Sequence, residues 1–320
     1  MASYDVFNGD ADGICALHQL RLHDPQPDAR LITGVKRDIR LLDKIKHVEN
    51  SSITVLDISM DSNHGPLCTL LEHGNSILYV DHHFSGDIPK NPALQAHIDP
   101  APQTCTSLIV DKILGGAYRE WAIVGAFGDN LDEAAEQSAL SLKLSRKELH
   151  RLREIGILLN YNGYGATVED LFFPPEDLFT HVHQWNTPFD FYDSSPVLQT
   201  LRQGYTTDME KAGEAIPIQQ DVAGRIFELP DESWARRAAG VFSNALAREK
   251  PELAHALLIA NADGSLRISV RAPLDTRQGA DELCRKFPTG GGRAAAAGIN
   301  QLPSALKKEF MAAFSRQFST

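Results

Sequence analysis

One segment of the chain reads Ser76-Ile77-Leu78-Tyr79-Val80-Asp81-His82-His83-Phe84, an apolar run that leads directly into an acid and two imidazoles. A short apolar run of this kind predicts a buried strand, so Asp81, His82 and His83 would follow where the strand leaves its sheet. In open α/β sheets, ligands bind outside the carboxyl ends of the strands. Taken alone, the triplet is equally compatible with a solvated loop.

Three other apolar runs also end in acidic side chains. The run that begins at Tyr4 leads into Asp10 and Asp12, a second run leads into Asp57, and the run 121–128 precedes Asp129. Carboxylates as close in sequence as Asp10 and Asp12 repel each other unless a cation lies between them. Carboxylates mixed with imidazoles suit Mn²⁺ or a similar divalent ion, whereas thiolates would suggest zinc. The four runs together therefore predict a metal site at the carboxyl edge of a sheet.

The order of the apolar patterns predicts the fold class. Helical patterns at 13–22, 38–47 and 64–73 alternate with strand patterns, which is typical of an α/β protein with a doubly wound, mainly parallel sheet. A chain of 320 residues suggests two domains. We expect a first domain at 1–195, a connection at 196–222 and a second, smaller α/β domain at 223–320.

The second domain carries a candidate anion site. An alternating strand at 266–272 places Arg271 on its polar face, and Gly290-Gly291-Gly292 is followed at once by Arg293. Successive glycines lack Cβ atoms, so their backbone amides can approach an anion closely. A flexible loop and an ordinary solvated strand face are the structural alternatives. We favour phosphate binding because an arginine follows the glycines directly.

Charge and hydropathy exclude several partners. The chain has 31 Lys and Arg against 42 Asp and Glu, a net charge of −11, which argues against a grip on long duplex DNA. No run approaches the ~18 to 20 apolar residues of a membrane helix, and the N-terminus lacks the pattern of a signal peptide. The four cysteines form no close pairs, and we expect them to be reduced. We therefore predict a cytoplasmic protein without a membrane partner; the sequence leaves the oligomeric state open, a homodimer included.

The motifs resemble those of the DHH phosphoesterases, a family named for the triplet that occurs here as Asp81-His82-His83. The glycine-rich run from Gly290 to Gly298 resembles the signature of the companion domain DHHA1. The two matches lie near opposite ends of the chain in the order that the family has. The segment 145–220 resembles the family more weakly.

The resemblance implies hydrolysis of a phosphodiester with two Mn²⁺ ions, for which Mg²⁺ or Co²⁺ could substitute. Asp10 and Asp57 would hold one ion, and Asp12, Asp57, His82 and Asp129 would hold the other. Asp81 would orient His82, and His83 would face the phosphate. In the second domain, the substrate's phosphate would meet these residues: Arg271, Gly290, Gly291, Gly292 and Arg293.

Two positions depart from the family pattern. The family commonly has histidine where this chain has Asn8, whose neutral amide oxygen is a weaker ligand for the first ion. It usually has histidine where this chain has Arg293. An arginine keeps anion binding but cannot transfer a proton.

Short oligonucleotides or dinucleotides, cleaved to mononucleotides, are the expected substrates, because the chain is acidic and the two domains could measure substrate length. Three alternatives remain. The chain could be a phosphatase of a mononucleotide such as 3′-phosphoadenosine 5′-phosphate or of polyphosphate, or a nucleotide-binding protein with weak catalysis. The third is a calcium loop starting at Asn8, which lacks the usual glutamate because Gln19 occupies that position.

Overall fold

The computed structural model describes residues 2–319. The chain divides into two compact units, Met1–Gln203 and Gly204–Thr320. The division falls inside one helix, α9 (Pro196–Gly213). Much of the segment 196–222, expected as a connection, is thus a regular helix.

The first unit contains a five-stranded sheet in the order β2-β1-β3-β4-β5. Every neighbouring pair is parallel, which confirms the predicted α/β class. Because the strands are parallel, their carboxyl ends share one edge, and the acids predicted from the sequence converge there. The strands are β1 (Ser3–Phe7), β2 (Arg30–Ile32), β3 (Ser52–Leu56), β4 (Ser76–Asp81) and β5 (Leu94–Ile98).

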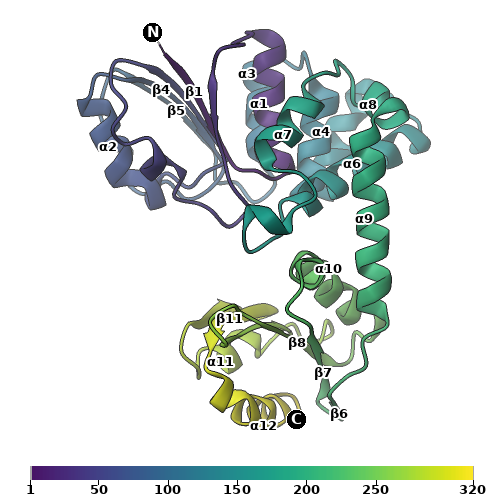
Figure 1. Cartoon of the computed structure of the whole chain (residues 1–320). Coiled ribbons are helices and arrows are strands. Elements are labelled where there is room, and N and C mark those ends of the chain that lie inside the picture. Colours follow the sequence, from purple (N-terminus) through teal and green to yellow (C-terminus); the bar gives the residue numbers. More distant parts are fainter. Residues whose placement is uncertain (1, 320) are drawn as a thin grey trace. The chain divides into compact units, whose positions relative to one another are not determined.

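Helices lie on both faces of this sheet, as a doubly wound fold requires. Figure 1 shows α2 on one side and α1 with α3 on the other. On the α2 side, Leu67 and Leu70 pack with Ile53, Val55 and Tyr79 in one buried cluster. The helices are α1 (Ala11–His23), α2 (His64–Glu72), α3 (Thr106–Ile113), α4 (Arg119–Gly128), α5 (Asp132–Ala139), α6 (Arg146–Asn162), α7 (Pro175–Val182) and α8 (Pro188–Ser194).

The apolar run before Asp129 is helix α4 and not the expected strand. Glycines make this helix pack closely: a Cβ at Gly125 would lie 2.2 Å from Ser107 Oγ, and one at Gly128 would lie 2.3 Å from Ala11 Cβ. An apolar run buried on all sides has no periodicity that separates a strand from a buried helix. Asp129 is the C-cap of α4, so it reaches the site from a helix end.

One further local prediction was wrong. The segment 38–47, expected as a helix, contains only the short 3-10 helix Leu41–Lys44. Further along the chain, His181 lies in α7 and His183 is its C-cap. Pro175 at the first position of α7 favours a helix start there.

The second unit contains a six-stranded sheet in the order β10-β11-β9-β8-β7-β6, in which β7 and β8 are the parallel pair. The helices α11 and α12 cover one face, where Ile226 and Leu258 are buried; α10 covers the other, where Phe227 and Leu257 are buried. The strands are β6 (Gln219–Asp221), β7 (Gly224–Leu229), β8 (Ala254–Ala260), β9 (Leu266–Arg271), β10 (Gly290–Arg293) and β11 (Ala296–Leu302). The helices are α10 (Ser233–Glu249), α11 (Ala280–Cys284) and α12 (Lys307–Phe318).

The three successive glycines form strand β10 and not a loop. Gly290 pairs with Ile299 and Gly292 with Ala297 in an antiparallel ladder. A Cβ at Gly290 would lie 1.8 Å from the Cys284 carbonyl oxygen, and one at Gly292 would lie 2.5 Å from Ala297 Cα. Both glycines are therefore required by packing. A Cβ at Gly291 would meet no described atom within 4 Å.

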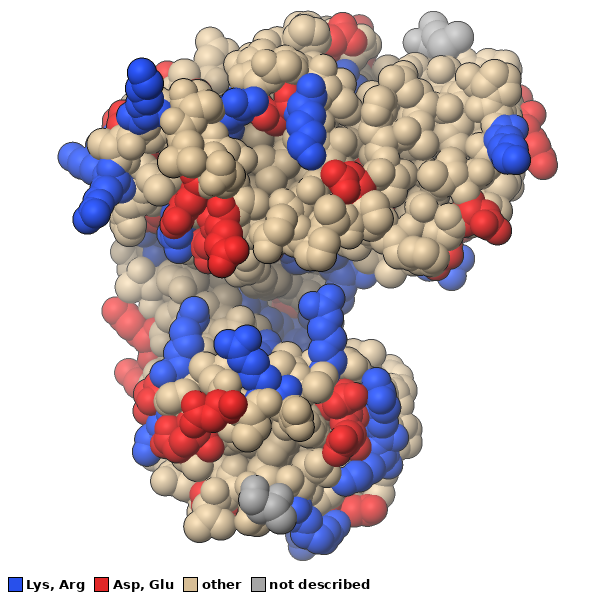
Figure 2. Space-filling view, turned by 180° about the vertical axis from the view of Figure 1, so that it is seen from behind, with Lys and Arg blue, Asp and Glu red and all other residues tan. Residues whose placement is uncertain are grey.

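The surface carries charged side chains of both signs. On the face drawn in Figure 2, acidic and basic side chains are interspersed over both units. Of the helices within 2–319, none is both long and apolar enough to cross a membrane.

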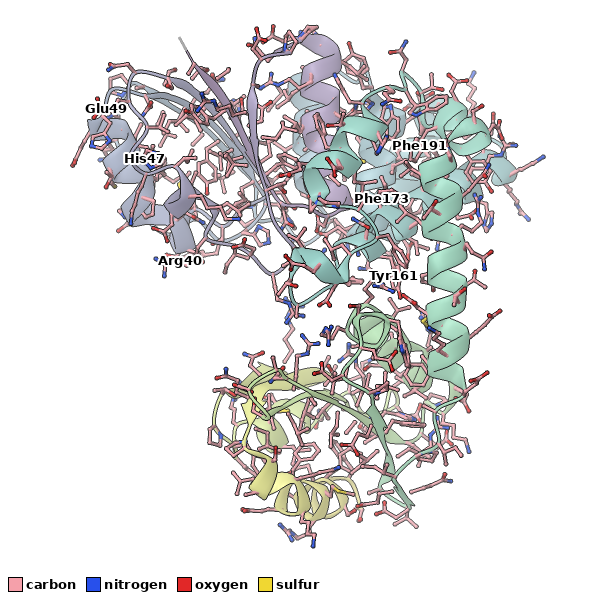
Figure 3. All side chains as sticks on the ribbon, viewed as in Figure 1. Arg40, His47, Glu49, Tyr161, Phe173 and Phe191 are labelled. Carbon is pink, nitrogen blue, oxygen red and sulfur yellow. The ribbon has the colours of Figure 1, made fainter. Side chains whose placement is uncertain are left out.

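Phe191 and Tyr161, labelled in Figure 3, belong to the interior of the first unit, with exposed fractions of 0% and 1%.

Candidate metal centre

Asp10 begins the site at the end of β1, where it caps helix α1. Its Oδ1 accepts hydrogen bonds from the backbone N–H groups of Asp12 at 3.0 Å and Gly13 at 3.1 Å. Its Oδ2 lies 2.5 Å from Lys36 Nζ. Burial opposes ionisation of this carboxyl, but the Lys36 ammonium and the helix N–H groups together lower its pKa.

Asp12 is fully buried and binds the N-terminus of helix α3. Its Oδ2 accepts from the Thr106 N–H at 2.7 Å, and its Oδ1 accepts from the Ser107 N–H at 2.8 Å and the Ser107 hydroxyl at 2.5 Å. A helix N-terminus has unpaired N–H groups that a carboxylate satisfies well. Asp12 thus attaches α3 to the site, in addition to its expected role as a metal ligand.

Asp57 follows β3 in a left-handed conformation, with φ of 58°. A residue with a Cβ adopts this conformation at a cost, and such strain is concentrated at functional sites. Asp57 Oδ1 accepts from the Thr106 hydroxyl at 3.1 Å. Burial, followed by the charges of Asp10 and Asp12, raises the pKa of Asp57 well above its ordinary value. A cation beside Asp57 would remove this penalty.

His82 points its Nε2 at two carboxylates. Nε2 lies 3.4 Å from Asp57 Oδ1 and 3.8 Å from Asp129 Oδ2, while Nδ1 lies 3.0 Å from the Thr104 carbonyl oxygen. A carbonyl can only accept, so Nδ1 carries a proton and Nε2 is the ring atom directed at the two carboxylates. A metal ion at this point would be held by one imidazole nitrogen and two carboxylate oxygens, with the Thr104 carbonyl fixing the orientation of the ring.

Asp81 contacts His83 and not His82, which corrects the expected pairing. His83 Nδ1 donates to Asp81 Oδ1 at 2.7 Å, and this hydrogen bond raises the pKa of His83 although partial burial opposes it. His82 is oriented instead by the Thr104 carbonyl. The His83 side chain is 44% exposed, so its Nε2 edge is open to a substrate.

Asp129 faces the same centre from the end of α4. Burial raises its pKa to about 6, and the nearby charge of Asp12 adds to this shift. Ligand atoms of Asp57, His82 and His83 lie within 4.8 Å of one another, and Asp129 adds a carboxylate beside His82. These donors fit a divalent ion that accepts oxygen and imidazole ligands.

Lys36 is the residue that the sequence analysis missed. It follows β2, and its Nζ lies 2.5 Å from Asp10 Oδ2, 3.0 Å from Asn160 Oδ1 and 3.5 Å from Asp129 Oδ1. Burial opposes its charge, but Asp10 and the other acidic groups raise its pKa above the ordinary value. Its position after the carboxyl end of a parallel strand was the available signal, because the same rule located the acids.

Asn8 lies beside Lys36. Its Nδ2 donates to the Lys36 carbonyl oxygen at 3.4 Å. Its Oδ1 is buried and has no hydrogen-bond partner among the described residues. Asn8 thus holds the backbone of Lys36 with its amide nitrogen.

Of the two arginines proposed to bind phosphate in the second unit, Arg271 hydrogen-bonds to another side chain and Arg293 is exposed. Arg271 lies in β9, and its Nε donates to Asn244 Oδ1 at 2.7 Å. Arg293 ends β10 and is exposed. Strand β11 pairs with β10 on one side and with β9 on the other, so Gly292 and Arg271 lie in the same sheet.

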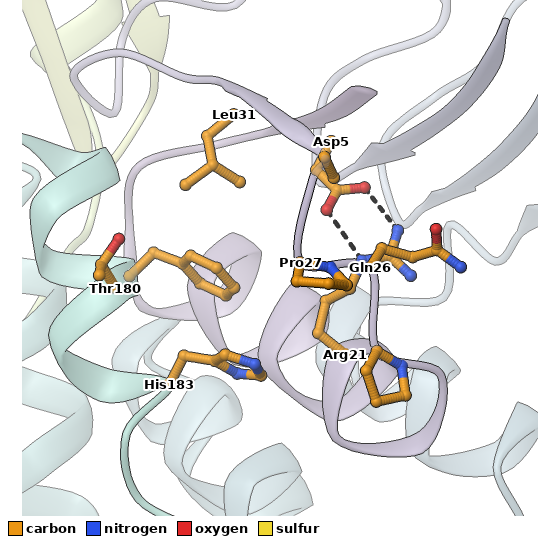
Figure 4. Close-up of a pocket in the computed structure, with 10 residues that line it drawn as sticks. Asp5, Arg21, Gln26, Pro27, Leu31, Thr180 and His183 are labelled. Carbon is orange, nitrogen blue, oxygen red and sulfur yellow. Dashed lines mark hydrogen bonds and ion pairs between the residues drawn. The ribbon is translucent and has the colours of Figure 1, made fainter. Parts of the chain in front are cut away.

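A cavity of about 260 Å³ lies elsewhere in the first unit, at Pro25, Leu31 and Phe179 (Figure 4). One wall is the ion pair in which Arg21 Nε donates to Asp5 Oδ2 at 2.8 Å. This bidentate pair neutralises both charges. None of the acids of the candidate metal centre lines this cavity.

Comparisons with known proteins agree with this architecture. No protein-family model and no curated protein matches the sequence. Among solved structures, exonuclease RecJ bound to manganese is 16% identical with a TM-score of 0.63, over 99% of this chain and 90% of that one. A DHH domain described as belonging to a family of ribosomal proteins is 12% identical with a TM-score of 0.62, over 98% and 86%.

A third similar structure is the pGpG-specific phosphodiesterase PggH from Vibrio cholerae, which is 14% identical with a TM-score of 0.56, over 99% of this chain and 98% of that one. Identities this low establish the fold. The chain therefore has the fold of DHH-domain proteins along nearly its whole length, as the motifs predicted.

Proposed function

We propose that this chain is a metal-dependent phosphoesterase that hydrolyses short oligonucleotides or dinucleotides to mononucleotides. The observation that carries the proposal is the position of His82 Nε2, which lies 3.4 Å from Asp57 Oδ1 and 3.8 Å from Asp129 Oδ2. This arrangement fits a divalent ion, and Mn²⁺ suits its oxygen and imidazole donors. A manganese-bound exonuclease and a phosphodiesterase of similar fold support the same class of reaction.

The residues around the ion suggest how the protein assists hydrolysis. Asp57, His82 and Asp129 would hold the ion, which when bound supplies a Lewis acid that polarises the phosphoryl oxygen and makes water a better nucleophile. His83 is positively charged over a wider pH range than free histidine because Asp81 accepts its Nδ1 proton. Its exposed Nε2 edge can therefore stabilise negative charge on the phosphate or give a proton to the leaving oxygen.

The proposed substrates are short because charge limits what the chain can bind. The net charge is −11, and basic side chains on the face in Figure 2 are interspersed with acidic ones. A long strand needs many phosphate contacts, whereas a dinucleotide needs few. Arg293 and Arg271 are the candidates for the end phosphate of such a substrate.

The test is Mn²⁺-dependent hydrolysis of a length series from a dinucleotide to a long single strand. We expect the dinucleotide to be cleaved fastest and His82→Ala to abolish turnover. His47→Ala is the matched control, because His47 is exposed. Equal rates of cleavage along the series would contradict the proposed preference for short substrates. Release of inorganic phosphate from 3′-phosphoadenosine 5′-phosphate or polyphosphate, with no cleavage in the series, would replace the proposal with a phosphatase.

A further inference from the structure

The ammonium of Lys36 lies against Asp10, one of the two carboxylates that were expected to hold the first of two ions. Nζ is surrounded by three oxygens: Asp10 Oδ2 at 2.5 Å, Asn160 Oδ1 at 3.0 Å and Asp129 Oδ1 at 3.5 Å. A lysine ammonium has three N–H donors and no acceptor. Its donors therefore match the oxygens around it in number.

Both oxygens of Asp10 already accept hydrogen bonds. Its Oδ1 accepts the N–H groups of Asp12 and Gly13 at the start of α1, and its Oδ2 accepts Lys36. A metal ion at Oδ2 would lie against the like charge of the lysine ammonium and would compete with it for this oxygen. Displacement of the lysine would leave a buried ammonium without its closest counter-charge, which is costly.

The backbone and surroundings of Lys36 fix it in this position. The Lys36 N–H donates to the Gly163 carbonyl at 3.0 Å, and its carbonyl accepts from Asn8 Nδ2 at 3.4 Å. Asn160 Nδ2 donates to the Tyr164 hydroxyl at 2.8 Å, which turns Asn160 Oδ1 towards the lysine. The Tyr164 ring centre lies 6.0 Å from Nζ. Residues from two other segments of the chain thus hold Lys36 in place.

We propose that Lys36 is a resident cation that replaces one metal ion, so that the chain binds a single divalent ion at Asp57, His82 and Asp129. This inference rests on the proposed metal-dependent function and refines it. Asn8 supports the lysine backbone through its amide nitrogen, while its buried Oδ1 has no hydrogen-bond partner among the described residues. Lys36 is a positioning residue, since its donors are directed to protein oxygens.

The test is the stoichiometry of Mn²⁺ binding, measured by equilibrium titration and by electron paramagnetic resonance at saturation. The wild-type protein should bind one ion per chain and give the hyperfine pattern of an isolated ion. Lys36→Met keeps the length of the side chain and removes the charge, so it should admit a second ion and give the signal of a coupled pair. Lys44→Met is the matched control, because Lys44 pairs with Asp38 in an exposed ion pair, and it should bind one ion.

Several outcomes would overturn the proposal. Two ions per wild-type chain, or a Lys36→Met protein that still binds one, would show that the lysine does not exclude the second ion. If Lys36→Met does not fold, Asp10→Asn replaces it, and loss of the single ion in that variant would show that Asp10 is a ligand. Two ions with active hydrolysis would reject only the lysine inference, whereas one ion without hydrolysis would reject only the proposed function.

Discussion

Asp12→Asn should destabilise the metal-free protein, because Asp12 attaches helix α3 to the sheet edge. The fully buried carboxylate accepts the N–H of Thr106 on one oxygen and the N–H and hydroxyl of Ser107 on the other. In asparagine, one oxygen becomes an NH₂ group, which is a donor. Whichever way the amide turns, at least one backbone N–H of α3 then faces another donor.

The magnitude follows from these contacts. A buried donor left without an acceptor costs about 1–3 kcal/mol. Loss of the negative charge at the N-terminus of α3 costs roughly another 0.3–1 kcal/mol. Relief of the repulsion with Asp57, whose pKa Asp12 helps to raise, acts in the opposite direction. We expect the free energy of unfolding to fall by about 2 kcal/mol.

Urea unfolding of the metal-free protein, followed by tryptophan fluorescence, measures this loss. Trp121 is fully buried in the first unit and reports on its unfolding. Ser107→Ala removes one of the three hydrogen bonds, and the double variant should lose less than the sum of the single variants, since the changes remove a shared contact. Asp43→Asn, in an exposed ion pair with Arg40, should change stability little. A change below ~0.5 kcal/mol in Asp12→Asn would refute the structural role of Asp12.

Three further predictions concern the charges of the site. Asp57→Gly should raise the thermal unfolding midpoint of the metal-free protein, because glycine adopts the φ of 58° without strain and carries no charge for the neighbouring acids to repel. The same variant should abolish hydrolysis, because it removes a proposed metal ligand. A lower midpoint would contradict the first expectation. The raised pKa of Asp129 means that the folded state binds its proton more tightly than the unfolded chain, so its contribution to the stability of the metal-free protein is fully present below pH 3.8 and is lost as pH rises through about 6; Asp129→Asn should therefore lose less unfolding free energy than the wild type over this range, and an equal loss in both proteins would exclude it. Asp81→Asn should lower the pKa of His83, because it replaces the charged acceptor with a neutral amide oxygen, and should move the alkaline limb of the pH–rate profile to lower pH; an unmoved limb would show that the His83 proton is not used.

The sequence predicted the parts of this fold that depend on strand ends. Asp81 ends β4, Asp57 follows β3 directly, and Asp10 lies in the turn between β1 and α1; a parallel sheet brings such residues to one edge. Asp129 was predicted in the same way for the wrong reason, since α4 is a helix whose glycines allow close contact with its neighbours. Its apolar run has no periodicity because the helix is buried on nearly all sides.

Partners that are distant in sequence could not be predicted from local patterns. Lys36 contacts Asp10, Asp129 and Asn160, and the last two lie on or beside helices far along the chain. The strand formed by the three glycines at Gly290–Gly292 depends on the neighbouring atoms of Cys284 and Ala297. Each of these features is a tertiary contact that composition and spacing leave open.

The charges of the site indicate which of its carboxylates still need a cation. Asp10 is compensated by two helix N–H groups and Lys36, and Asp12 by two N–H groups and a hydroxyl. Asp57 receives one hydroxyl, and Asp129 shares Lys36 at the longer distance of 3.5 Å. Both of these carboxylates have raised pKa values, and both lie within 4 Å of His82 Nε2. The uncompensated charge is therefore concentrated at one point, so a single divalent ion satisfies the site and a second would compete with groups that the protein already supplies.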